Sequence, residues 1–130
     1  MTTEFINPEG IAQPTGYTHV VATDARKTIY ISGQIGVDAQ GSAREGLRAQ
    51  TIQVFENLKT ALASVGATFD NVVKVTYLIV NYKPEDRATI VEIRSQYFNA
   101  QHPPASTLIG VQALARPELL IEIEAIAALE

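Results

Sequence analysis

The chain has 130 residues, of which 46% are hydrophobic, so it can build one continuous core, and we expect a single domain spanning residues 1–130. It contains no cysteine, which excludes a disulfide framework, a thiolate metal site and a cysteine nucleophile. The formal net charge is −4 and the ten basic residues are scattered along the chain, which argues against a nucleic-acid partner because phosphate binding needs concentrated positive charge.

The first strongly patterned segment, residues 28–37, alternates as a strand does. This pattern predicts a core face and a polar face, with Ile29, Ile31, Ile35 and Val37 on the first and Thr28, Tyr30, Ser32 and Gln34 on the second. Gly33 and Gly36 within one strand indicate a bulge or a close approach of another group to the backbone. We expect residues 19–23 to be the partner strand, and residues 38–41 to form a turn.

Two segments have helical spacing. Between Leu47 and Val65 the apolar stripe consists of Phe55, Leu58, Leu62 and Val65, and Gly66 is placed to end the helix. A second helix is predicted to begin at Pro84, with Glu85 and Asp86 at the positive end of its dipole. Its buried stripe is predicted to consist of Ile90, Ile93 and Tyr97.

Three further strands are predicted, over residues 72–80, 105–111 and 119–127. The first should face inward through Val73, Val75, Tyr77 and Ile79. The order of elements indicates an α+β fold, with one mixed sheet and both helices packed on one face. The uncovered face would carry Tyr30, Leu78, Val80 and Ile126 among polar groups. Such a face favours self-association, although an ordinary solvated sheet face is the alternative.

Three segments resemble the RidA/YjgF family in their sequence, order and separation: residues 31–35 (ISGQI), 103–107 (PPAST) and 121–127 (IEIEAIA). The resemblance implies a chorismate-mutase-like fold and a homotrimer with ligand clefts between subunits. It also implies hydrolysis of reactive enamines and imines, such as 2-aminoacrylate, although some relatives carry an endoribonuclease label instead.

By this resemblance, Tyr17, Ser32 and Glu122 match positions that family members place in the cleft. The substrate-binding arginine of the family does not carry over, because the matching position here is Ser106. A family asparagine likewise corresponds to Val91, and a frequent cysteine two residues beyond the arginine corresponds to Leu108.

We take Glu122 as the candidate catalytic acid and base, since one carboxyl group can serve both steps of imine hydrolysis. Its alternative is a solvated carboxylate between two inward-facing isoleucines. Ser32 could bond to substrate, Tyr17 could form an aromatic wall, and backbone groups at Gly33 could bind ligand. Their alternatives are structural roles. Arg116 is the nearest cation along the chain that could replace the missing arginine, and its alternative is a surface loop residue.

The two histidines, His19 and His102, are isolated, so we expect no metal, and no motif calls for a cofactor. His102 could line the cleft, because Ser106 follows it closely. We expect a cytoplasmic protein without a membrane partner, because no apolar run approaches the roughly 20 residues that cross a bilayer and no secretion signal is evident.

The preferred hypothesis is a RidA-like hydrolase acting on a small imine, enamine or related metabolite, but not efficiently on 2-aminoacrylate because of Ser106. The first alternative is a trimer that binds a small metabolite without turnover. Endoribonuclease action is the weaker alternative, given the acidic charge balance.

Overall fold

The computed structural model describes residues 2–130 and follows the predicted order of elements, with an additional strand at the start. The elements are β1 (Thr3–Ile6), β2 (Val20–Thr23), β3 (Lys27–Ile35), α1 (Gly46–Ala63), η1 (Phe69–Asn71), β4 (Val72–Val80), α2 (Pro84–Arg94), β5 (Ala105–Val111) and β6 (Ile121–Leu129). None of the helices in this part of the chain is long and apolar enough to cross a membrane.

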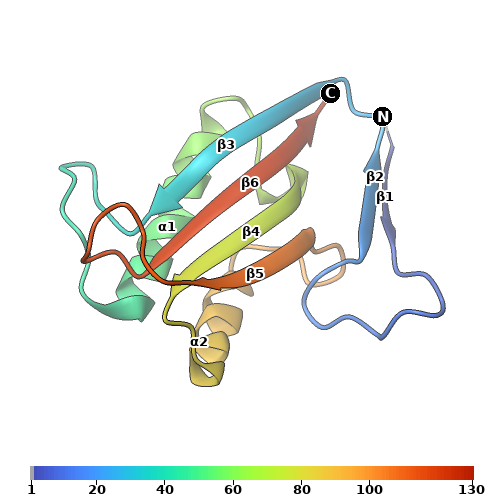
Figure 1. Ribbon diagram of the computed structural model, residues 1–130. Helices are drawn as coiled ribbons and strands as arrows, with labels where there is room; N and C mark the ends of the chain where they lie inside the picture. The colour runs from blue at the N-terminus through green and yellow to red at the C-terminus, as the bar shows by residue number, and fades with distance from the viewer. Residues whose placement is uncertain (1) are drawn as a thin grey trace.

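The main sheet has the strand order β3-β6-β4-β5 (Figure 1). Strand β6 is antiparallel to both of its neighbours, whereas β4 and β5 are parallel. Helix α2 belongs to the connection between these parallel strands, which cannot be joined by a tight turn. Both helices lie behind the sheet in Figure 1. The predicted α+β fold, a mixed sheet with two helices on one face, is therefore confirmed.

The predicted pairing of residues 19–23 with the strand that follows is wrong. Strand β2 pairs instead with β1, from Thr3 opposite Thr23 to Ile6 opposite Val20. The two strands form a separate ribbon beside the main sheet (Figure 1). The reason is that β1 presents a complete antiparallel ladder to β2, while β3 uses its inner edge for β6.

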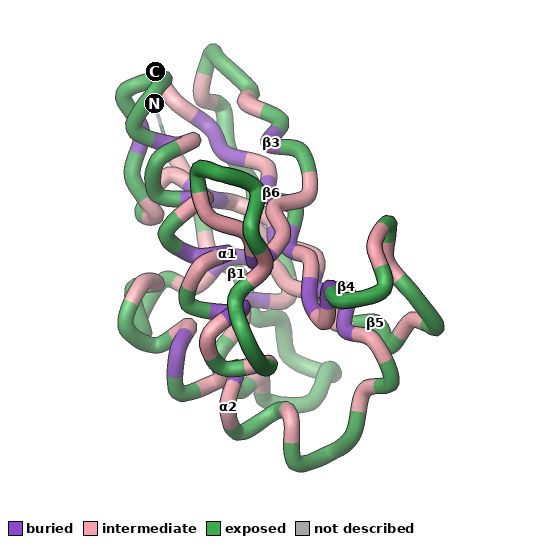
Figure 2. Tube along the Cα trace, turned by 90° about the vertical axis from the view of Figure 1, so that its left-hand side faces the viewer, coloured by how far each residue is buried: buried purple, intermediate pink, exposed green. Residues whose placement is uncertain are grey.

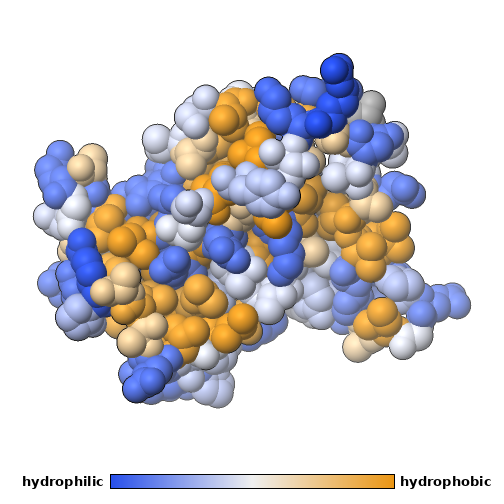
Figure 3. All heavy atoms as spheres, turned by 45° about the horizontal axis from the view of Figure 1, so that its top comes forward, coloured by the Kyte–Doolittle hydropathy of each residue, from blue (hydrophilic) through white to orange (hydrophobic). Residues whose placement is uncertain are grey.

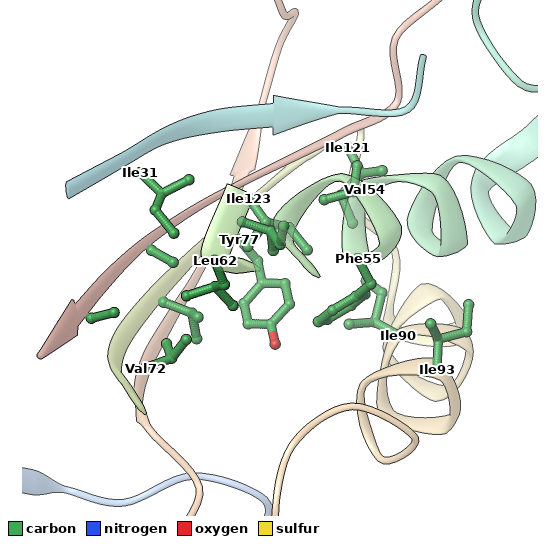
Figure 4. Packing of buried hydrophobic residues seen from close by; sticks show 14 of the residues in the cluster. Ile31, Val54, Phe55, Leu62, Val72, Tyr77, Ile90, Ile93, Ile121 and Ile123 are labelled. Atoms are coloured by element: carbon green, nitrogen blue, oxygen red, sulfur yellow. The ribbon is translucent and has the colours of Figure 1, made fainter. Parts of the chain in front are cut away.

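The core lies between the sheet and the two helices, where the buried parts of the chain gather (Figure 2). Helix α1 contributes the predicted Phe55, Leu58 and Leu62, and α2 contributes Ile90 and Ile93 (Figure 4). Tyr97 follows α2 and stacks on Phe55 with ring centroids 4.8 Å apart.

The prediction for Val65 is wrong, since this side chain is 41% exposed. Helix α1 ends at Ala63, and Gly66 follows with φ +76°. The N–H of Ala67 donates to the carbonyl of Leu62, and that of Gly66 donates to the carbonyl of Ala63. This is the glycine-terminated helix end that was predicted, but it turns the chain before Val65 reaches the core.

Two shifts of register change which residues face inward. Between Ile31 and Gln34, β3 has one residue more than β6, so Ile35 lies opposite Glu122 and outside the core cluster. The predicted core position of Ile35 is therefore wrong, and Val37 lies beyond the strand. A second irregularity in β4 buries Val72 in place of the predicted Val73. Alternation fails at each shift because an extra residue reverses the phase of the strand.

Gln50 joins α1 to the two loops at one end of the sheet. Its side chain is 1% exposed, and its amide donates to the carbonyls of Arg44 and Glu118 at 3.1 and 2.9 Å. Its oxygen accepts from the N–H of Leu120 at 2.8 Å. A Cβ atom at Gly36 would lie only 2.5 Å from the Cβ of Gln50, so the glycine permits this packing. Both N–H donors of the amide and one of the two acceptor sites on its oxygen thus fix these loops.

We predict that Gln50→Met lowers the free energy of unfolding by about 2–4 kcal/mol, because buried backbone groups lose their partners. Gln53→Met is the matched control on the same helix. The Gln53 amide bonds only to the Asn57 side chain, so a loss of about 1 kcal/mol or less is expected. Urea unfolding at equal protein concentration, followed by circular dichroism, measures both values. Equal losses in the two variants would contradict the assigned role of Gln50.

Candidate functional site

Three of the predicted site residues meet at the bulge of β3. Ser32 and Gly33 form the irregular step between Ile31 and Gln34, next to strand β6. The Glu122 side chain from β6 lies directly over Gly33, where a Cβ atom would be 2.6 Å from its Cδ and 2.8 Å from its Cγ. The predicted bulge and the predicted close approach to the backbone are therefore both present. A side chain at position 33 would occupy the space of the carboxylate.

The Glu122 carboxylate has no ion-pair partner within residues 2–130. Register places it opposite Leu78, on the sheet face that the helices leave open. A carboxylate that is partly shielded and unpaired can accept a proton, donate it again or bind water. This is the arrangement that acid and base chemistry requires.

The neighbouring part of the open face holds a hollow of about 260 Å³. It is lined by Tyr30, Ile31, Ser32, Lys74, Thr76, Glu124, Ala125 and Ile126. Burial lowers the pKa of Lys74, although the negative charge of Glu124 acts in the opposite direction. Lys74 donates to the Thr107 hydroxyl at 2.9 Å. Apolar and polar side chains alternate over the surface shown in Figure 3, and Tyr30 is 78% exposed. The open face is therefore mixed in character, as the sequence predicts.

A second group of site residues lies where the loop after β1 meets the start of β5. Thr18 is buried, and its hydroxyl donates to the carbonyl of Pro103 at 2.6 Å, while its N–H donates to the carbonyl of Pro104. These bonds hold Tyr17 close to the chain that leads into Ser106. Sequence reasoning missed Thr18, because a single threonine in a loop carries no pattern.

Beside this junction is a hollow of about 230 Å³. It is lined by Thr15, Gly16, Val91, Arg94, Ser95, Phe98, Asn99, Ala100 and Pro103. Val91 and Arg94 are one helical turn apart on α2 and so share a face. Arg94 was not singled out by the sequence, where it appears only as one of ten dispersed basic residues.

Within one chain, Ser106 and Glu122 do not meet. Strands β3 and β5 are the two edges of the sheet, so Gly33 and Ser106 are about 14 Å apart at the spacing of neighbouring strands. Ser106 is aligned with the buried Val75 and faces the helix side, whereas Glu122 faces the open side. The predicted site residues thus form two separate groups.

The remaining candidates have partners within the chain. Arg116 forms an ion pair with Glu118 at 3.0 Å and donates to the carbonyl of Gly41, which disfavours its prediction as a substrate-binding residue. His102 packs against Phe5 with ring centroids 4.9 Å apart. His19 Nε2 donates a hydrogen bond to the carbonyl of Ala12, and the ring lies edge-on to Tyr17. No cluster of three or more metal-ligating side chains occurs in the described residues.

The fold is that of a small α+β protein with a mixed four-stranded sheet, in which a carboxylate of β6 lies over a glycine of β3. The model of the family described as Endoribonuclease L-PSP matches residues 9–129. This match covers nearly the whole chain, so the chain belongs to that family, which also carries the Rid and YjgF names.

Individual relatives and a solved structure are consistent with this family. Human 2-iminobutanoate/2-iminopropanoate deaminase is 38% identical over 113 residues, covering 85% of this chain and 78% of the human protein. A RutC family protein of Pyrococcus abyssi is 35% identical, and 98% of each chain is covered. Among solved structures, the Rid family protein YyfB of Yersinia pestis is 43% identical with a TM-score of 0.91, covering 99% of this chain and 100% of that one.

We predict that Gly33 and Glu122 are energetically coupled. Gly33→Ala should lower stability by about 1 kcal/mol, because the new methyl group forces the Glu122 side chain out of its rotamer. In a Glu122→Ala background the same substitution should have almost no effect, since the overlapping atoms are gone. Urea unfolding of the four proteins of this double-mutant cycle measures the coupling. An equal loss in both backgrounds would show that backbone strain, not the carboxylate, selects glycine.

Proposed function

We propose that this protein is a hydrolase that deaminates a small reactive imine or enamine, with Glu122 as the catalytic acid and base. The observation that supports this proposal is the unpaired Glu122 carboxylate over Gly33. The related human protein is named an iminobutanoate and iminopropanoate deaminase, which agrees with this type of reaction.

The proposed reaction needs only one carboxyl group and water. The Glu122 carboxylate removes a proton from a water molecule as the oxygen attacks the imine carbon. The protonated carboxyl then gives its proton to the nitrogen, which leaves a carbinolamine. Glu122 next takes the proton of the carbinolamine hydroxyl and delivers it to the amine as the C=O bond forms and the C–N bond breaks, so that a ketone and ammonia are released. An enamine first tautomerises to the imine. Ser32 would donate a hydrogen bond to the substrate or to the attacking water. The atoms balance without a cofactor.

A complete cleft would require a second copy of the chain. Tyr17 and Ser106 lie at one edge of the sheet, while Ser32, Gly33 and Glu122 lie at the other. A homotrimer could bring one group from each of two neighbouring subunits together, forming three equivalent clefts. The open sheet face offers the surface for this association.

We expect light scattering at micromolar concentration to report a homotrimer of about 42 kDa, three times the 14.1 kDa of one chain. The physical reason is that the mixed apolar face between β3 and β5 is left uncovered by the helices and can be buried by other copies. A mass near 14.1 kDa at all concentrations would remove both the association and the composite cleft.

Ser106 sets the expected substrate preference. A hydroxyl cannot replace the fixed positive charge of a guanidinium toward a carboxylate. Removing one partner of a buried charge pair costs about 2–5 kcal/mol, so 2-aminoacrylate should be handled roughly 30-fold to several thousand-fold less well than by an arginine-bearing relative.

We predict that the unmodified protein accelerates the loss of 2-aminoacrylate, supplied in situ, only weakly. Ser106→Arg should raise this rate. The gain should disappear when Ser106→Arg is combined with Glu122→Gln, because an arginine that holds the substrate carboxylate positions the substrate but transfers no proton. Ser106→Lys is the matched control, since it adds the charge without the bidentate geometry. Rapid hydrolysis by the unmodified protein would contradict the role given to Ser106.

Binding without turnover is the second candidate function. Two observations favour it: Ser106 is a serine where the resemblance implies an arginine, and Val91 is apolar where it implies an asparagine. This candidate would gain support if Ser106→Arg left the rate unchanged while the protein kept its fold and assembly.

A further inference from the structure

Arg94 lies in the hollow between α2 and the loop that contains Gly16. It is the last residue of α2 and is partly buried in the hollow beside Gly16. A Cβ atom at Gly16 would lie 2.9 Å from the Cζ of Arg94, so a larger residue there would push the end of this side chain aside. Gly16 also has φ +77°, a conformation that L side chains rarely adopt. The loop thus brings its backbone close to this side chain.

The guanidinium has no carboxylate partner. Within residues 2–130 the arginine ion pairs join Arg48 to Glu92 and Arg116 to Glu118. The hollow that contains Arg94 is lined by no aspartate or glutamate. The Thr15 carbonyl accepts a long hydrogen bond of 3.4 Å from Nη2. A guanidinium carries five N–H donors, so several remain available to a ligand.

A second partner of the charge is a buried phenol, that of Tyr77. Burial raises the pKa of Tyr77 to about 12, and the positive charge and hydrogen bond of Arg94 act against this shift. The hydroxyl therefore stays neutral and cannot neutralise the guanidinium. Figure 4 shows the Tyr77 ring in the core with its hydroxyl directed away from the sheet.

Arg94 stands on the same side of the sheet as Ser106. Tyr77 is aligned with Leu108 and Val75 is aligned with Ser106, so all four side chains face the helix side. A cation that reaches the Tyr77 hydroxyl from α2 is therefore near the strand where the resemblance implies an arginine. The charge of Arg94 comes from helix α2, whereas the arginine that the resemblance implies would stand on strand β5.

We propose that Arg94 binds the carboxylate of the ligand, and that Val91, Phe98 and Pro103 hold an apolar side chain next to it. The ligand would then be a small carboxylate with an apolar side chain. This inference rests on the proposed function for the imine chemistry, but the binding of the carboxylate does not depend on turnover. A half-buried guanidinium with free N–H donors, next to apolar side chains, is better matched by a planar carboxylate than by water molecules.

The test is isothermal titration with sodium 4-methyl-2-oxopentanoate, a stable product analogue, using the full-length protein. Arg94→Gln is expected to weaken binding at least about tenfold, because a charge-assisted bidentate contact is lost. The affinity of Arg94→Lys should lie between those of the unmodified protein and Arg94→Gln, since lysine keeps the charge without the planar guanidinium. The methyl ester of the same compound should bind weakly to the unmodified protein and be insensitive to Arg94.

Arg87→Gln is the matched control, because Arg87 lies on the same helix but is exposed and does not line the hollow. It should bind the 2-oxo acid as the unmodified protein does. Gly16→Ala gives an independent check, since its methyl group displaces the Arg94 guanidinium without removing the charge. Thermal unfolding of each variant confirms that it is folded before titration.

Unchanged affinity in folded Arg94→Gln, an equal loss in Arg87→Gln, or no binding of the 2-oxo acid by the unmodified protein would each overturn this inference. Glu122→Gln separates it from the proposed function. If this variant and the unmodified protein bind equally but neither hydrolyses imines, the proposed function fails and the role of Arg94 stands. If imines are hydrolysed while Arg94→Gln binds normally, the role of Arg94 fails alone.

Discussion

Two helices can cover only one face of a four-stranded sheet, and this constraint decides where chemistry can occur in the chain. The helix face is filled by the packing of α1 and α2 against alternate residues of the strands. The other face keeps Glu122, Glu124, Lys74 and Tyr30 at the surface or in a shallow hollow. Because the edges of the sheet lie about 14 Å apart at normal strand spacing, no small ligand can touch Gly33 and Ser106 of the same chain. Catalysis that uses both edges therefore depends on association.

The bulge in β3 is the local feature that brings Ser32, Gly33 and Glu122 together. An extra residue at Ser32–Gly33 reverses the alternation, so the segment beyond it presents Ile35 rather than Gln34 beside Glu122. Glycine at position 33 of this bulge leaves the space that the carboxylate occupies. Bulges often stand next to active sites because they redirect side chains without unfolding the sheet. Here the ladder resumes at once, and the rigid sheet fixes Glu122.

Sequence patterns predicted the features that depend on local chemistry. Helical spacing placed Phe55, Leu58 and Leu62 in the core, and Gly66 marked the helix end because its left-handed conformation is a local property. Gly33 indicated the bulge. The phase reversal that follows depends on the partner strand, so Ile35 was predicted on the wrong face. The pairing of β2 with β1 is likewise a long-range choice that no local pattern contains. Arg94 was missed for the same reason, because its contact with Gly16 joins residues that are far apart in the sequence.

Whether an arginine can bind a ligand depends on where its side chain lies and on what already contacts it, not only on its presence in the sequence. Arg116 is near the last strand along the chain, but Glu118 and the Gly41 carbonyl occupy its donors. Arg94 follows a helix turn that carries Val91, and no carboxylate of the described chain neutralises it. If a substrate carboxylate is held by a helix residue instead of a strand residue, its reactive carbon must lie at a different distance from Glu122 of a neighbouring subunit. A change in the origin of the cation would thereby select a substrate of different length, while the chemistry proposed for the carboxylate at the bulge would stay the same.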